Sequence, residues 1–214
     1  MSYYWEEVDK KRFGKSLKWF ERRIFARVIG NRPIQSCLDV GGGAGHKFAV
    51  DCEDYTLVEM EPAAIAIFRD RYPAGHFIEG DFLALNLEKK YDLILMIQLS
   101  TYAECIRKMV TKAYSLLAEN GLMLFTATNK NSYKGLLYSK GYAYQEGYAY
   151  QESYSALKKF LKTLGASSIS YYGYGWLPFR RDSNSILIPL LKWIDIVFGR
   201  FVSLSPWLLI IVKK

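Results

Sequence analysis

The chain has 214 residues, half of them apolar, which predicts a single globular domain with a substantial core. Its formal net charge of +8 favours anionic partners but says nothing of the fold. Three cysteines without metal-ligand spacing and a total of two histidines argue against a disulfide framework and a metal centre. Reduced thiols and an aromatic, acidic start without a signal-peptide pattern predict a cytoplasmic protein.

Residues 1–30 predict an N-terminal helical segment. Leu17, Phe20 and Ile24 recur at helical spacing, and the pattern ends at Gly30. Basic residues such as Lys18 occupy another face of this helix. We interpret that face as solvated, with a nucleic-acid or anionic-ligand surface as the alternative.

Strands and helices then alternate along the chain. A helix is expected after Pro62, a second over residues 103–119 that ends at Asn120-Gly121, and a third over residues 157–164 before Gly165. The expected strands cover residues 34–40, 55–59, 77–79, 91–97, 122–128, 168–172 and 207–212. Such alternation predicts right-handed βαβ units and a mostly parallel sheet.

A glycine-rich turn follows the first expected strand, in the run Cys-Leu-Asp-Val-Gly-Gly-Gly-Ala-Gly-His over residues 37–46. Its glycines allow positive φ and let a ligand lie against the main chain. The dinucleotide fingerprint needs its last glycine one residue later, and no Gly-Lys-Ser/Thr follows as in a P-loop. The spacing therefore favours a nucleotide-like cofactor without a pyrophosphate clamp, which S-adenosylmethionine fits.

Polar residues stand at the ends of the next expected strands. Glu59 ends the second strand, where a carboxylate can accept hydrogen bonds from two ribose hydroxyls. Asp81 follows the third, where it can accept from an adenine amino group while Phe82 packs on the ring. Gln98 follows the fourth.

In this order the motifs resemble the class I S-adenosylmethionine-dependent methyltransferases over residues 34–129. The resemblance implies a single methyltransferase domain over residues 1–214, with a Rossmann-like α/β fold. Its sheet would have seven strands, mostly parallel with the last strand antiparallel, and helices on both faces. Asp39 and the glycines would hold the methionine part of the cofactor, Glu59 the ribose and Asp81 the adenine. The implied cofactor-binding set is Asp39, Gly41, Gly42, Gly43, Gly45, Glu59, Met60, Asp81, Phe82 and Gln98.

The family's small-molecule branch, which modifies quinones, lipids and sugars, is the most similar. The chain lacks the Asn/Asp-Pro-Pro-Tyr signature of amino-methylating nucleic-acid enzymes and has no Pro-Cys nucleophile. We therefore expect methyl transfer to a small-molecule or lipid-linked acceptor. The alternatives are an RNA-modifying methyltransferase and a non-catalytic, partner-regulating protein of the same fold. His46, Tyr102 and Glu104 are candidate bases, and none is assigned.

Two further segments carry hypotheses. Residues 130–153 contain the repeat Gly-Tyr-Ala-Tyr-Gln-Glu twice, interpreted as a surface loop or as a flap over the acceptor. Residues 185–202 are strongly apolar, which favours core or homodimer surface, with peripheral membrane contact as the alternative.

The acceptor side of the site is expected to be an aromatic wall with few fixed charges. Its candidate residues are Tyr3, Tyr4, Trp5, Tyr102, Tyr133 and Tyr138.

Overall fold

The computed structural model describes residues 4–30, 32–46, 52–99, 106–138, 152–179, 182–191 and 193–214. Seven strands form one sheet in the order β3-β2-β1-β4-β5-β7-β6. The strands are β1 (Ser36–Val40), β2 (Asp54–Glu59), β3 (His76–Glu79), β4 (Tyr91–Met96), β5 (Leu117–Thr128), β6 (Ser168–Tyr174) and β7 (Trp207–Lys213). The helices are α1 (Tyr4–Lys10), α2 (Arg12–Ile29), α3 (Pro62–Arg71), α4 (Ile106–Ser115), α5 (Tyr133–Tyr138), α6 (Tyr154–Lys162), α7 (Ile188–Leu191), α8 (Trp193–Phe198) and the 3₁₀ turn η2 (Val202–Leu204).

The pairing of the strands confirms the predicted fold class. β1 pairs in parallel with β2 and β4, β2 with β3, and β4 with β5. β7 lies between β5 and β6 and runs antiparallel to both. The parallel strands therefore end at a common edge, where loops can build a site.

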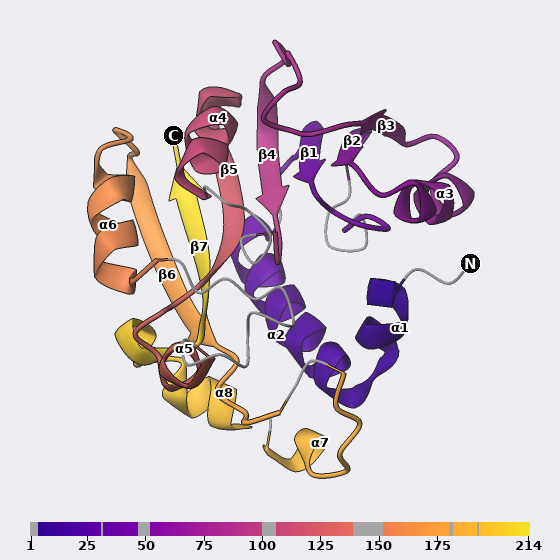
Figure 1. Cartoon of the computed structure of the whole chain (residues 1–214). Helices are drawn as coiled ribbons and strands as arrows, with labels where there is room; N and C mark the ends of the chain where they lie inside the picture. The colour runs from indigo at the N-terminus through magenta and orange to yellow at the C-terminus, as the bar shows by residue number, and fades with distance from the viewer. Residues whose placement is uncertain are drawn as a thin grey trace.

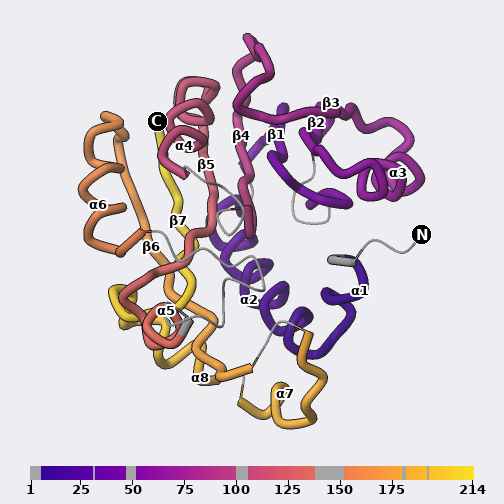
Figure 2. The backbone as a smooth tube through the Cα atoms, in the orientation of Figure 1, coloured from indigo at the N-terminus to yellow at the C-terminus, as the bar shows by residue number. Residues whose placement is uncertain are grey.

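Helices cover both faces of the sheet, each over its own apolar cluster (Figure 1). On one face, Phe20 and Phe25 of α2 and Phe68 of α3 pack on alternate residues of the strands. On the other, Val110 of α4 and Leu161 of α6 do the same. The tube view shows α1 and α3 on one side of the molecule and α6 on the other (Figure 2). This two-faced burial explains why the central strands are almost wholly apolar.

The N-terminal helical segment consists of two helices, of which α2 contains the predicted apolar stripe. The chain forms α1, turns at Lys11 and continues as the 18-residue helix α2. Gly14 permits the tight turn, because a Cβ at this position would lie 2.6 Å from the carbonyl oxygen of Val8. α1 is thereby folded back on α2.

The helix expected to end at Asn120-Gly121 was placed too far along the chain. In the described residues α4 ends at Ser115, and Leu117 already pairs with Tyr91 of β4. The register then shifts, so that Leu93 pairs with Leu122. Asn120 has φ +62°, and Gly121 has no room for a Cβ, which would lie 2.9 Å from the carbonyl oxygen of Ala118. The Asn-Gly pair thus forms an irregularity within β5 rather than a helix cap.

Candidate functional site

A cavity of about 620 Å³ lies at the carboxyl ends of β1, β2, β3 and β4, bounded on its other side by α1 and α2. Its size is that of a small-ligand site. The part of the predicted set that lines it comprises Gly41, Gly42, Gly43, Gly45, Glu59, Met60, Asp81, Phe82 and Gln98. Asp39 is the member that does not line it. The structure therefore brings residues from four strand ends to one space.

The glycine turn has the backbone that its sequence predicts. Gly41, Gly43 and Gly45 have φ of +60°, +57° and +89°, a region that favours glycine. The Gly41 amide donates to the carbonyl of Val58 at 2.8 Å, which fixes the turn against β2. The main chain of the turn therefore forms one wall of the cavity.

Asp39 supports this turn from behind. Its carboxylate is fully buried and accepts hydrogen bonds from the His46 amide at 2.8 Å and from the Tyr55 hydroxyl. The Nδ1 atom of His46 lies 3.0 Å from both carboxylate oxygens. A Cβ on Gly42 would lie 2.2 Å from this carboxylate. Asp39 thus holds the shape of the turn without facing the cavity.

His46 lines the cavity, and its side chain contacts the Asp39 carboxylate. Burial alone would lower the pKa of His46, but the negative charge of Asp39 and the hydrogen bond to it outweigh burial, so the His46 pKa is raised. Burial, followed by the charge of Asp39, raises the pKa of Tyr55 well above its usual range. Tyr55 therefore remains a neutral donor to the Asp39 carboxylate.

Glu59 at the end of β2 connects the turn to the next helix. Its Oε2 atom accepts from the Gly43 amide at 2.8 Å, and its Oε1 atom accepts from the amides of Met60 at 2.8 Å and Glu61 at 3.1 Å. Three main-chain donors therefore orient this carboxylate at the cavity wall. Such a fixed acceptor suits recognition of hydroxyl groups.

Asp81 and Phe82 form another part of the wall. Asp81 is exposed, and its Oδ1 atom accepts from the Leu83 amide at 2.9 Å, which caps the turn after β3. Phe82 is buried, with the Lys112 ammonium 5.1 Å from its ring centroid. Met60 is largely exposed and also lines the cavity. Together they provide apolar surface beside a carboxylate.

A buried polar network at the floor of the cavity includes a residue that the sequence reasoning missed. Gln98, with φ +61°, donates from Nε2 to Glu21 Oε1 at 2.8 Å, and the Tyr174 hydroxyl donates to the same oxygen at 3.1 Å. Glu21 is buried in α2 and lines the cavity. Glu21 is the residue that was missed. Its position next to the apolar stripe of Leu17, Phe20 and Ile24 could have indicated a buried carboxylate, which requires hydrogen-bond partners.

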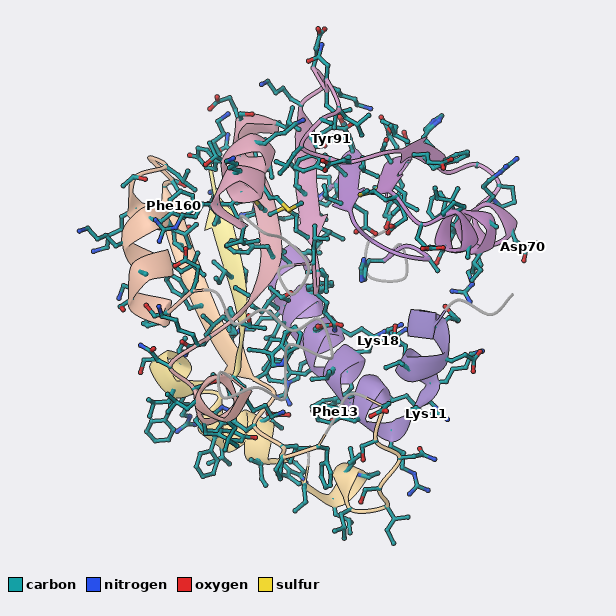
Figure 3. The ribbon with its side chains drawn as sticks, in the orientation of Figure 1. Lys11, Phe13, Lys18, Asp70, Tyr91 and Phe160 are labelled. Atoms are coloured by element: carbon teal, nitrogen blue, oxygen red, sulfur yellow. The ribbon has the colours of Figure 1, made fainter. Side chains whose placement is uncertain are left out.

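The basic residues of α2 do not all face solvent as expected. Lys18 and Arg22 line the cavity, and Lys18 pairs with Asp9 of α1 at 2.7 Å. Arg71 of α3 donates to both carboxylate oxygens of Glu6, at 2.6 and 3.2 Å. α1 is thus tied to both α2 and α3 beside the cavity, and labelled Lys18 lies between α2 and α1 (Figure 3).

The expected aromatic wall with few charges stays a prediction, because most of its candidate residues lie outside the described lining. That lining has more carboxylates than basic groups, namely Glu6, Asp9, Glu21, Glu59, Glu61 and Asp81 against Lys18, Arg22, Arg71 and His46. Tyr133 stacks on Trp176 and donates to its carbonyl at 2.7 Å, so it belongs to another part of the molecule. Tyr3 and Tyr102, and the side chains of Tyr4, Trp5 and Tyr138, lie outside the described residues.

The predicted flap over residues 130–153 is described only in part. Its helix α5 places the Lys134 ammonium 5.2 Å from the ring centroid of Phe13 at the start of α2. Residues 139–151, which hold nearly all of the repeat, lie outside the described residues, as do Tyr102 and Glu104. The flap hypothesis therefore stays a prediction.

Comparison with known sequences finds a matching family and relatives that are similar over part of their length. The sequence pattern of a family described as methyltransferase domain matches residues 8–169. Nodulation protein S of Sinorhizobium fredii is 31% identical over 106 residues, covering 45% of this chain and 49% of that protein. Ribosomal RNA small subunit methyltransferase A of Chlorobium limicola is 35% identical over 69 residues, covering 31% of this chain and 26% of that protein. The chain thus spans less than two thirds of either relative.

Comparison of structures extends the likeness to nearly the whole chain. The crystal structure of the N-methyltransferase NodS from Bradyrhizobium japonicum WM9, in complex with S-adenosyl-L-homocysteine, superposes with a TM-score of 0.62. The match covers 97% of this chain and 90% of that one at 15% identity. At this identity the match establishes a shared fold.

Proposed function

This chain belongs to the methyltransferase-domain family, and from that premise we propose that it transfers a methyl group from S-adenosylmethionine to a small-molecule or lipid-linked acceptor. The observation that carries the proposal is the fixed Glu59 carboxylate at the edge of a positive-φ glycine turn, both lining one cavity. A ribose with two free hydroxyls fits such an acceptor.

The other lining residues fit the same cofactor. The turn from Gly41 to Gly45 offers unobstructed main chain for the methionine part, and Asp39 and His46 keep the turn in shape. Asp81 and Phe82 offer an acceptor and an aromatic face for the adenine. When bound, the cofactor supplies an electrophilic methyl group on a sulfonium. The chain's own contribution is to align the acceptor and exclude water, and alignment can supply about 7–11 kcal/mol of the barrier.

The charges of the cavity support a small acceptor over a phosphate backbone. Phosphate recognition needs an excess of available Arg and Lys. Here Lys18 is paired with Asp9 and Arg71 with Glu6, and the described lining carries more carboxylates than cations. A buried carboxylate, Glu21, faces the same space and suits a donor group, such as an amine or a hydroxyl, on the acceptor.

RNA methylation is the second candidate, because the Chlorobium limicola relative carries that activity in its name. The similarity covers less than a third of this chain, so it supports RNA as the acceptor only weakly. Retention of the protein on immobilised ribosomal RNA at moderate salt, with methyl incorporation into it, would favour this candidate over a small molecule.

Calorimetric titration with S-adenosylmethionine and S-adenosylhomocysteine tests the cofactor assignment. We expect one molecule bound per chain. The absence of binding for both ligands would overturn the proposal. Incubation with the labelled methyl donor and fractionated small-molecule, lipid and RNA pools then identifies the acceptor class. Cofactor binding without transfer to any pool would instead favour the non-catalytic alternative.

A further inference from the structure

Large apolar side chains are exposed along one edge of the molecule, formed by α5, the loop before α7, α7, α8 and η2. Their exposed fractions run from 43% to 73%. The set comprises Leu136, Leu137, Ile186, Leu187, Leu190, Trp193, Val197, Phe198, Phe201 and Leu204. Other large apolar residues exposed in the described chain, such as Trp19 and Phe77, are scattered on separate elements. Concentration of apolar surface on one edge marks an interaction site.

Contacts between elements hold this apolar edge together. Tyr133 of α5 stacks on Trp176, Trp176 contacts Phe198 of α8, and Phe198 contacts Phe201, with ring centroids 5.4–6.2 Å apart. The buried Asp195 carboxylate accepts from the Trp176 amide at 2.6 Å, which anchors α8 to the end of β6. α7 precedes α8 by one residue, and both lie at the lower edge with α5 (Figure 1). The apolar residues are therefore presented on an anchored support.

Basic residues flank the apolar edge. The start of α2 is joined to the loop before α7, since the Phe13 amide donates to Ser183 and Arg12 donates to Asn184 through its amide and guanidinium. Lys11 and Lys15 are exposed at this end of α2, as is Arg200 after α8. Figure 3 shows labelled Lys11 and Phe13 at the same end of the molecule as α7.

Nearby carboxylates neutralise only part of the positive charge beside the apolar edge. Glu7 pairs with Lys10 at 2.7 Å, Asp195 is buried, and Asp182 is exposed in the loop before α7. Lys11, Lys15 and Arg200 leave the edge with a basic border.

We propose that this edge binds the surface of an anionic lipid bilayer. Exposed Trp, Phe and Leu side chains enter the interface between headgroups and acyl chains, while Lys and Arg beside them contact lipid phosphates. In the part of the chain that the structure describes, no helix has the length and apolarity to cross a bilayer. Docking of a second copy through the same edge would bring like basic borders together, which disfavours it.

Flotation with vesicles tests the proposal. The protein should float with vesicles of equimolar phosphatidylcholine and phosphatidylglycerol, and much less with pure phosphatidylcholine. Trp193→Ser and Leu190→Ser should each weaken binding about tenfold or more, the value of burying one large apolar side chain. Lys11→Gln and Lys15→Gln should each weaken binding to the anionic vesicles about fivefold. Trp19→Ser, which removes a tryptophan from a different surface, is the matched control and should leave flotation unchanged.

Two outcomes would overturn the proposal. One is no flotation with either vesicle. The other is a dimer in sedimentation that Trp193→Ser dissociates while vesicles fail to bind, which would assign the edge to a second copy. The substituted side chains are exposed, and unchanged melting temperatures would verify that each variant folds. Flotation requires no methyl donor, so its result is independent of the methyl-transfer proposal.

Discussion

The main-chain amide of Gly43 donates a hydrogen bond to the Glu59 carboxylate over 2.8 Å. The residue proposed to hold the ribose therefore also fixes the glycine turn proposed to hold the methionine part. Binding of the ribose and binding of the methionine part are therefore coupled through one side chain, and a change at Glu59 affects both.

Substitution of Glu59 tests this coupling. Glu59→Ala should weaken S-adenosylmethionine binding by at least about 1.5–3 kcal/mol, the scale of hydrogen bonds to a charged group. Calorimetry measures the change, and Glu79→Gln, an exposed carboxylate on the neighbouring strand, is the matched control. Equal affinities of wild type and Glu59→Ala would refute the assignment.

Gly42→Ala should destabilise the protein and reduce cofactor binding. Its Cβ would lie 2.2 Å from the fully buried Asp39 carboxylate, which His46 and Tyr55 hold in place. Loss of about 2 kcal/mol or more in the free energy of unfolding is expected from such overpacking. Gly165→Ala provides the control, since its φ of +74° carries a strain cost but no atom lies within 4 Å of the added Cβ. Similar losses for the two variants in urea denaturation would contradict the steric explanation.

The α1 helix should open when its tie to α3 is cut. Arg71→Ala removes both hydrogen bonds to Glu6, and deuterium exchange of residues 4–10 should accelerate several-fold. The melting temperature should change little, because the pair is partly exposed and such pairs contribute about 0–1 kcal/mol. Lys10→Ala removes the exposed pair with Glu7 and should leave exchange unchanged. Unaltered exchange in Arg71→Ala would show that α1 is held by other contacts.

Lys134 predicts a pH dependence of stability. Burial lowers the pKa of Lys134 from 10.5 to about 8, and the charge of Asp195 opposes this shift. Between pH 8 and pH 10.5 the unfolded chain keeps a proton that the folded chain has lost, so this residue's contribution to stability rises with pH. Relative to Lys134→Met, the wild-type free energy of unfolding should therefore increase across this window. If the difference in free energy of unfolding between the two proteins stays constant from pH 8 to pH 10.5, the pKa of Lys134 is not lowered in the folded chain.

Local sequence patterns were sufficient to predict which residues at the strand ends line the cavity. Glu59, Asp81 and Gln98 follow strands, and the ends of parallel strands meet at one edge, so local patterns were sufficient to group them. Glu21 and Lys18 line the cavity because α2 packs against the sheet and α1 packs against α2, which helical periodicity alone does not specify. Asp39 was predicted to bind the cofactor, and only the fold shows that its carboxylate instead contacts Tyr55 and His46 behind the turn. The Asn120-Gly121 error arose because local turn chemistry does not distinguish a helix cap from an irregular strand.

The placement of β7 has a consequence for folding during synthesis. This strand follows the other six along the chain, yet its backbone pairs with both β5 and β6. Until residues 207–213 have left the ribosome, β5 and β6 cannot be joined, and each has an unpaired backbone edge. After β6 is complete and before β7 pairs, the nascent chain therefore carries two open strand edges, which makes this stage the one most exposed to aggregation and to chaperone capture.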